Sequence, residues 1–123
     1  MIEVWKDIKG YEGKYKISNA GKVKHLTYAI QQYEKEGQLM CNLRNEDGTI
    51  TPASICRLVA EAFIPNPEGK EVVRHRGDIY NNKVNNLEWV SIQEYLELFF
   101  KSFLKKHEIR RRKKITKNKD VNE

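Results

Sequence analysis

The chain has 123 residues, of which 39% are hydrophobic and 33% charged, and its formal net charge is +6. This is enough apolar material for one modest core, and two cysteines are too few for a disulfide framework or a structural zinc site. No run of eighteen apolar residues and no signal-peptide pattern occurs, so we expect a cytoplasmic protein that does not span a membrane.

The first half of the chain predicts short antiparallel strands joined by turns. Residues 14–18 alternate polar and apolar side chains, as a half-buried strand does, and Asn19-Ala20-Gly21 predicts a tight turn. Asp47-Gly48 is a pair that favours a hairpin. The strands predicted from these patterns cover residues 5–8, 14–18, 22–26, 38–43 and a stretch that begins at 49.

A helix is predicted over residues 54–63, with Ser54 as its N-cap because a serine oxygen can accept from a first-turn N–H. Its apolar residues fall on one face, and Pro65 and Pro67 prevent its continuation. A short strand over 71–73 follows, then a polar loop over 74–86 and a last strand over 87–90.

The final helix is predicted to start at Ser91, because Glu94 three residues later completes a capping box. The helix continues to about Lys106 and frays in the basic run that follows. Its apolar residues repeat at helical spacing, and the stripe is wide for so small a domain. They are Ile92, Tyr95, Leu96, Phe99, Phe100, Phe103 and Leu104.

The positive charge is concentrated at the end of the chain. Residues 101–123 carry ten Lys or Arg and three acidic residues, a net +7, whereas residues 1–100 carry a net −1. Electrostatic attraction to a polyanion is therefore predicted to rest mostly on this tail. The alternative is a solvated, disordered terminus that only aids solubility.

Three blocks of sequence, in series, resemble the phage HNH homing endonuclease family. Residues 3–23 look like the N-terminal modular motif of that family, and residues 57–67 look like the helix before its catalytic core. Residues 72–75 and 81–90 look like the core itself. The resemblance implies an α+β fold, with a small antiparallel N-terminal sheet, a ββα-metal core, and a long C-terminal amphipathic helix with a basic tail. The segments expected are 1–53, 54–107 and 108–123.

The resemblance also implies catalytic roles. Phosphodiester hydrolysis needs a base to deprotonate water and a cation to offset negative charge. His75 matches the general base of the family, and Asn86 matches the asparagine that orders the loop between strand and helix. The implied cofactor is a divalent metal, Mg²⁺, if the enzyme is active, and none otherwise.

Two positions depart from the metal site of the family. Arg74 stands beside the base, where an oxygen ligand is expected, and a guanidinium has no lone pair to offer. Tyr95 stands where the helix ligand is expected, and a neutral phenol is a poor magnesium ligand. The loop after His75 is one residue shorter than in relatives, and aligning it on Asn81-Asn82 instead does not restore a complete site. Asp78 and Glu94 are the remaining candidates for a metal ligand.

Three functions stay open at this point. The first is a DNA-binding protein of HNH descent that has impaired or lost metal-dependent nicking. The second is an active magnesium-dependent nicking endonuclease. The third is a scaffold that regulates or inhibits a protein partner.

Each hypothesis has its candidate residues. DNA contacts are expected from Arg74, Arg76, Lys105, Lys106, Arg110, Arg111, Arg112, Lys113 and Lys114. A homodimer or protein partner would use Phe99, Phe100, Phe103 and Leu104.

Overall fold

A computed structural model describes residues 2–106 of the chain. It divides into two compact units, Met1–Val90 and Ser91–Glu123. The predicted boundary between 53 and 54 falls inside the first unit, and the predicted segment 54–107 crosses the division at 90/91. The predicted tail, 108–123, lies outside the described residues. Within those residues, no helix is long and apolar enough to cross a membrane.

The N-terminal strands form an antiparallel sheet in the order β1-β2-β3-β4. Tyr15 and Ile17 point into the core while Lys16 faces solvent, which is the alternation that the sequence predicts. β4 was not predicted, because residues 27–30 lack an alternating pattern. The strands are β1 (Trp5–Asp7), β2 (Tyr15–Ser18), β3 (Val23–His25) and β4 (Tyr28–Ala29).

A second antiparallel sheet has the order β5-β6-β7. The predicted Asp-Gly hairpin joins β6 to β7, where the backbone N–H of Asn45 donates to Thr49 O at 2.8 Å. Cys41 is buried in β6, and this burial raises the pKa of its thiol to about 11, so the thiol stays neutral. The strands are β5 (Tyr33–Lys35), β6 (Gln38–Arg44) and β7 (Ile50–Ser54).

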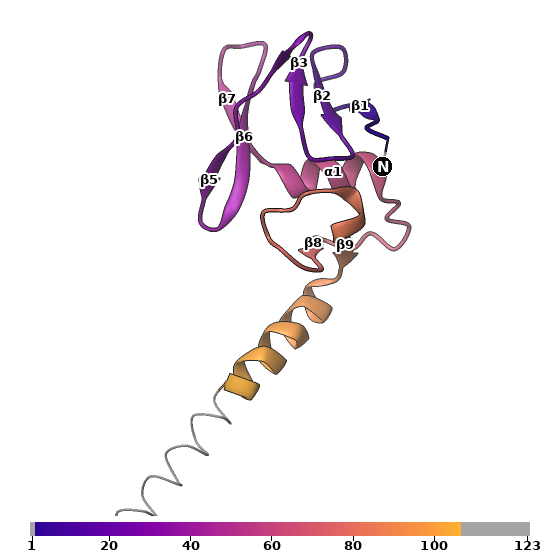
Figure 1. Cartoon of the computed structure of the whole chain (residues 1–123), viewed down its shortest axis with the longest axis vertical. Helices are drawn as coiled ribbons and strands as arrows, with labels where there is room; N and C mark the ends of the chain where they lie inside the picture. The colour runs from indigo at the N-terminus through magenta and orange to yellow at the C-terminus, as the bar shows by residue number, and fades with distance from the viewer. Residues whose placement is uncertain (1, 107–123) are drawn as a thin grey trace, which may run out of the picture. The chain divides into compact units, whose positions relative to one another are not determined.

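Helix α1 (Ile55–Phe63) agrees with the predicted helix and holds the first unit together. It lies between the N-terminal strands and the later β8–β9 hairpin, as Figure 1 shows. Its buried face contributes to one core with side chains of β2, β3, β6 and β9. Completely or almost completely buried in that core are Ile17, Val23, Leu43, Ile55 and Val59.

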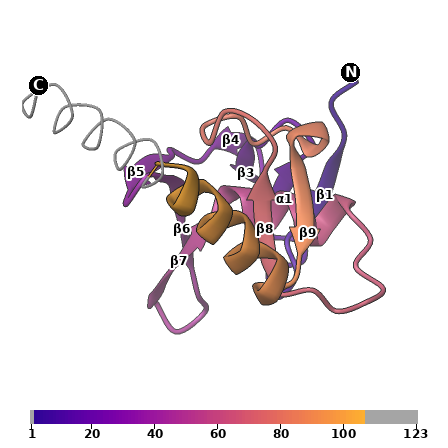
Figure 2. The ribbon, with the colours of Figure 1, turned by 90° about the horizontal axis from the view of Figure 1, so that it is seen from below.

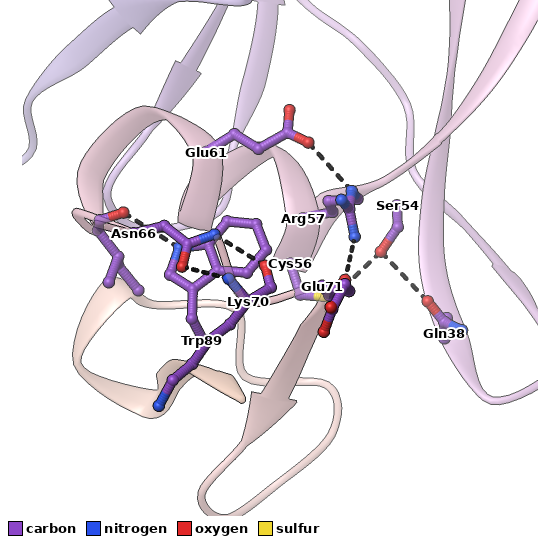
Figure 3. Close-up of polar contacts among 10 residues, drawn as sticks. Gln38, Ser54, Cys56, Arg57, Glu61, Asn66, Lys70, Glu71 and Trp89 are labelled. Carbon is purple, nitrogen blue, oxygen red and sulfur yellow. Dashed lines mark hydrogen bonds and ion pairs between the residues drawn. The ribbon is translucent and has the colours of Figure 1, made fainter. Parts of the chain in front are cut away.

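The predicted cap of α1 was wrong in its hydrogen bond. Ser54 occupies the N-cap position, but its hydroxyl caps no helix N–H. It lies 3.1 Å from Gln38 Oε1 and 3.1 Å from Cys56 Sγ instead (Figure 3). β7 runs directly into α1, so Ser54 is also paired with β6, and its hydroxyl bonds across the strands to Gln38.

The chain then forms an antiparallel hairpin of β8 (Val72–His75) and β9 (Leu87–Val90), which lie side by side in Figure 2. A 3-10 turn, η1 (Val84–Asn86), precedes β9. In the second unit, residues 92–106 are helical, and the N–H of Glu94 donates to Ser91 Oγ at 3.0 Å, as the capping box predicts. The predicted α+β class is thus confirmed.

Candidate active site and nucleic-acid interface

His75 lies at the end of β8, opposite Leu87 of β9. Its Nε2 lies 2.7 Å from Oδ1 of Asn82, a side chain that is only 6% exposed. With the amide oxygen as acceptor, Nε2 carries the proton and donates, which leaves a lone pair on Nδ1. When the ring is neutral, Nδ1 is therefore the nitrogen that can accept a proton.

Asn86 ties together the loop between β8 and β9. Its Oδ1 accepts from the N–H of Gly77 at 3.0 Å, and its Nδ2 donates to the carbonyls of Asp78 at 2.9 Å and Asn81 at 2.8 Å. Its own carbonyl accepts from the N–H of Arg76 at 2.8 Å. One side chain thus fixes the path of a loop that has little other regular structure.

The same loop is attached to the N-terminal sheets. The N–H of Val84 donates to Asn19 O at 2.9 Å, and the Tyr80 hydroxyl donates to Glu34 Oε1 at 2.9 Å. That hydrogen bond to a carboxylate raises the pKa of the Tyr80 phenol. At Gly21, whose φ is +81°, an added Cβ would lie 2.9 Å from Asn82 Cβ. The residue that orients His75 therefore packs directly against the Asn19-Ala20-Gly21 turn.

Arg74 and Arg76 share one carboxylate. Arg74 is the cross-strand neighbour of Glu88, and its Nη1 lies 2.7 Å from Glu88 Oε1. Arg76 Nε lies 3.4 Å from Glu88 Oε2. Because side chains alternate along a strand, this cluster and His75 lie on opposite faces of the hairpin.

The hairpin is anchored to α1 by polar contacts, which Figure 3 shows. Arg57 Nη1 donates to Glu71 O at 2.9 Å, and its Nε lies 3.0 Å from Glu61 Oε1. The Arg57 guanidinium also lies 5.5 Å from the centre of the Trp89 ring, and Trp89 Nε1 donates to Ile64 O at 3.1 Å. These contacts fix the position of the β8–β9 hairpin relative to α1.

Among residues 2–106, no group of three or more His, Cys, Asp and Glu side chains is arranged to hold a metal ion. Asp78 lies in the loop after His75, where its Oδ1 accepts from the N–H of Tyr80 at 2.9 Å. Glu94 and Tyr95 lie on the helix of the second unit.

Comparison with known proteins identifies the family. Residues 3–57 match the NUMOD4 motif. A solved structure of DNA binding and cleavage by the HNH homing endonuclease I-HmuI superposes with a TM-score of 0.71 at 35% identity, over 80% of this chain and 59% of that one. The chain belongs to the HNH homing endonuclease family.

Curated HNH relatives agree with this assignment. DNA endonuclease I-HmuI of Bacillus phage SP01 is 39% identical over 95 residues, which cover 71% of this chain and 52% of the relative. An HNH endonuclease of Acanthamoeba polyphaga mimivirus is 38% identical over 102 residues, which cover 77% of this chain and 25% of the relative. The chain thus spans a quarter to about half the length of these HNH endonucleases.

The predicted site residues of this HNH homologue fall into separate places. His75, Arg74, Arg76, Asp78 and Asn86 gather on the β8–β9 hairpin and its loop. Lys105 and Lys106 are exposed in the second unit, as are the predicted partner residues Phe99, Phe100, Phe103 and Leu104. The predicted DNA contacts Arg110, Arg111, Arg112, Lys113 and Lys114 lie outside the described residues.

Sequence reasoning missed two residues of this hairpin. Asn82 was given no part in the chemistry of the site, although its side chain bonds to His75. Glu88 was given no role, although it holds Arg74 and Arg76. The alternation of β9 could have revealed Glu88 once the register with β8 was known, whereas nothing local in the sequence marks the contact of Asn82.

Proposed function

We propose that this protein binds DNA, as an HNH homing endonuclease homologue, and that its metal-dependent nicking is impaired or lost. The observation that carries the proposal is the ion pair of Arg74 with Glu88, at 2.7 Å. The resemblance puts an oxygen ligand at position 74, and a guanidinium repels a cation there. The setting proposed is the cytoplasm of a bacterial host.

The described residues near His75 do not fit a magnesium ion. Beside the imidazole, the Oδ1 of Asn82 is engaged by Nε2. Glu88, on the other face of the hairpin, is held by two guanidinium groups. His75 keeps the role of a proton acceptor through Nδ1, and Asn86 keeps the role of ordering the loop. Without a cation near it, that base has no partner to offset charge on the phosphate.

The test is a plasmid assay that restores the expected ligands. Wild-type protein with Mg²⁺ or Mn²⁺ is expected to shift supercoiled plasmid without converting it to open circles. The double variant Arg74→Asp with Tyr95→Asn is expected to gain metal-dependent nicking. Adding His75→Ala to that double variant is the control, and it should abolish the gain.

The competing hypothesis of an active enzyme is decided by the same assay. Robust nicking by wild-type protein, lost in His75→Ala, would show that Asp78, Glu94 or another group supplies the metal ligands. The proposal of impaired nicking would then be rejected, and the DNA-binding part of the proposal would stand.

A protein partner or a second copy of the chain is the other candidate. The observation that favours it is the run of exposed apolar side chains in the helix over 92–106, where Phe99 is 57% and Phe100 56% exposed. Contiguous exposed apolar surface marks interaction sites on proteins. Such a surface is compatible with DNA binding by the first unit.

A further inference from the structure

The cluster of Arg74, Glu88 and Arg76 has the composition of an anion site. Cross-strand pairing puts Arg74 and Glu88 on one face of the hairpin. Arg76, just past the end of β8, brings its guanidinium to the same carboxylate. Each guanidinium touches a different oxygen of the same carboxylate, at 2.7 Å and 3.4 Å. Glu88 therefore aligns two like charges side by side.

The charge of this cluster is not balanced. Two guanidinium groups and one carboxylate leave a net +1, and one phosphodiester group carries −1. Each arginine spends one nitrogen on Glu88, so most of its five N–H donors remain for another acceptor. Guanidinium groups bind phosphate oxygens through such paired donors.

Solvent reaches the cluster. The side chains of Arg74, Glu88 and Arg76 are 37%, 30% and 60% exposed. Arg76 and Glu88 also line a cleft of about 310 Å³, whose other walls include Lys70 and Trp89. A strand of DNA can therefore reach Arg76 and Arg74 without unfolding the hairpin.

We propose that Arg74 and Arg76 together bind one phosphate of the DNA backbone, and that Glu88 both aligns them and limits the affinity by competing for them. The inference rests on the proposed DNA binding and adds the site and its internal competitor. The positive charge that binds the backbone here is a fixed guanidinium pair, so binding needs no divalent cation.

A purely structural ion pair makes a different prediction. Partly exposed salt bridges contribute about 0 to 1 kcal/mol to stability, so removing Glu88 would change folding slightly and DNA affinity hardly at all. In a phosphate site with a competing carboxylate, removing Glu88 frees both guanidinium groups. The size of the Glu88→Gln effect on DNA affinity, compared with that of a matched charge change elsewhere, therefore separates the two interpretations.

The experiment is fluorescence anisotropy with a labelled DNA duplex, in EDTA, with full-length protein over a series of salt concentrations. Glu88→Gln is expected to tighten binding by about three- to tenfold and to steepen the dependence on salt. Arg74→Gln and Arg76→Gln are expected to weaken binding and to reduce the salt slope by about one each. Arg76 is more exposed than Arg74, so Arg76→Gln is the variant least expected to disturb folding.

The control is the Arg57–Glu61 pair on α1, which has a similar ion pair at 3.0 Å and similar exposure. Glu61→Gln changes the net charge as Glu88→Gln does. Lys16→Gln, at an exposed cation of β2, changes the net charge as the arginine variants do. Both controls are expected to change affinity less than twofold. Thermal melts check that each variant is folded.

Two outcomes would overturn the inference. Equal effects of Glu88→Gln and Glu61→Gln would show a general charge effect, and the inference would fail while the proposed DNA binding stands. No binding by wild-type protein at any salt concentration would reject the proposed function and this site with it.

Discussion

Gly21 shows how a single residue controls the candidate site. Its φ of +81° lies in the left-handed region that favours glycine, and the side chain of Asn82 leaves no room for a Cβ. Gly21→Ala is expected to destabilise the fold by about 2 kcal/mol or more, because backbone strain adds to a clash with the residue that orients His75. Thermal or urea unfolding measures the loss.

Gly13 offers a matched control for that variant. Its φ is +76°, but nothing lies within 4 Å of an added Cβ. Gly13→Ala therefore carries the backbone strain without the clash, and it should cost less stability than Gly21→Ala. If the two variants lose the same stability, the contact of Gly21 with Asn82 has no energetic role.

At the scale of elements, local patterns predicted most strands, α1 and the final helix. They failed where a side chain has a distant partner. Ser54 was predicted to cap α1 but bonds to Gln38 of β6, a residue that pairing of β6 with β7 brings near. The contact of Asn82 with His75 depends on the path of a loop that Asn19 and Gly21 hold from far away in the sequence. The resemblance to relatives, not periodicity, pointed to His75 and Asn86.

The helix over 92–106 supports a prediction of its own. Full-length protein is expected to associate, with itself or with a protein partner, through the face that contains Phe100. Burial of the exposed half of a phenylalanine contributes about 2 kcal/mol, so Phe100→Asp should weaken association by roughly thirtyfold or more. Sedimentation velocity over a range of concentrations measures self-association.

Leu98 supplies the control on the same helix. Two residues along a helix turn the side chain by about 200°, so Leu98 and Phe100 point to opposite sides. Leu98→Asp should leave association nearly unchanged. A wild-type chain that stays monomeric at high concentration would exclude the second copy as partner, and equal loss in both variants would contradict a specific face.

For the whole molecule, the distribution of charge is the feature that matters for DNA. Residues 1–90 carry 13 Lys or Arg and 12 Asp or Glu, a net +1. We therefore expect the first unit to bind phosphate only where local clusters such as Arg74 and Arg76 gather positive charge. The basic segment 101–123, which includes the predicted tail, carries +7, and we expect it to supply long-range attraction. We expect the tail to set most of the affinity and the salt dependence, and the hairpin to set where the first unit sits on the duplex.

Neutralising the basic run tests this division. Replacing Arg110, Arg111, Arg112, Lys113 and Lys114 with glutamine should reduce the slope of log affinity against log salt by about four, because each phosphate contact contributes about 0.9. A variant with Lys9, Lys35 and Lys83 replaced by glutamine, all exposed in the first unit, is the control and should change the slope by less than one. If the control loses more affinity than the tail variant, DNA binding rests on the first unit, and the net charge of the tail is incidental to it.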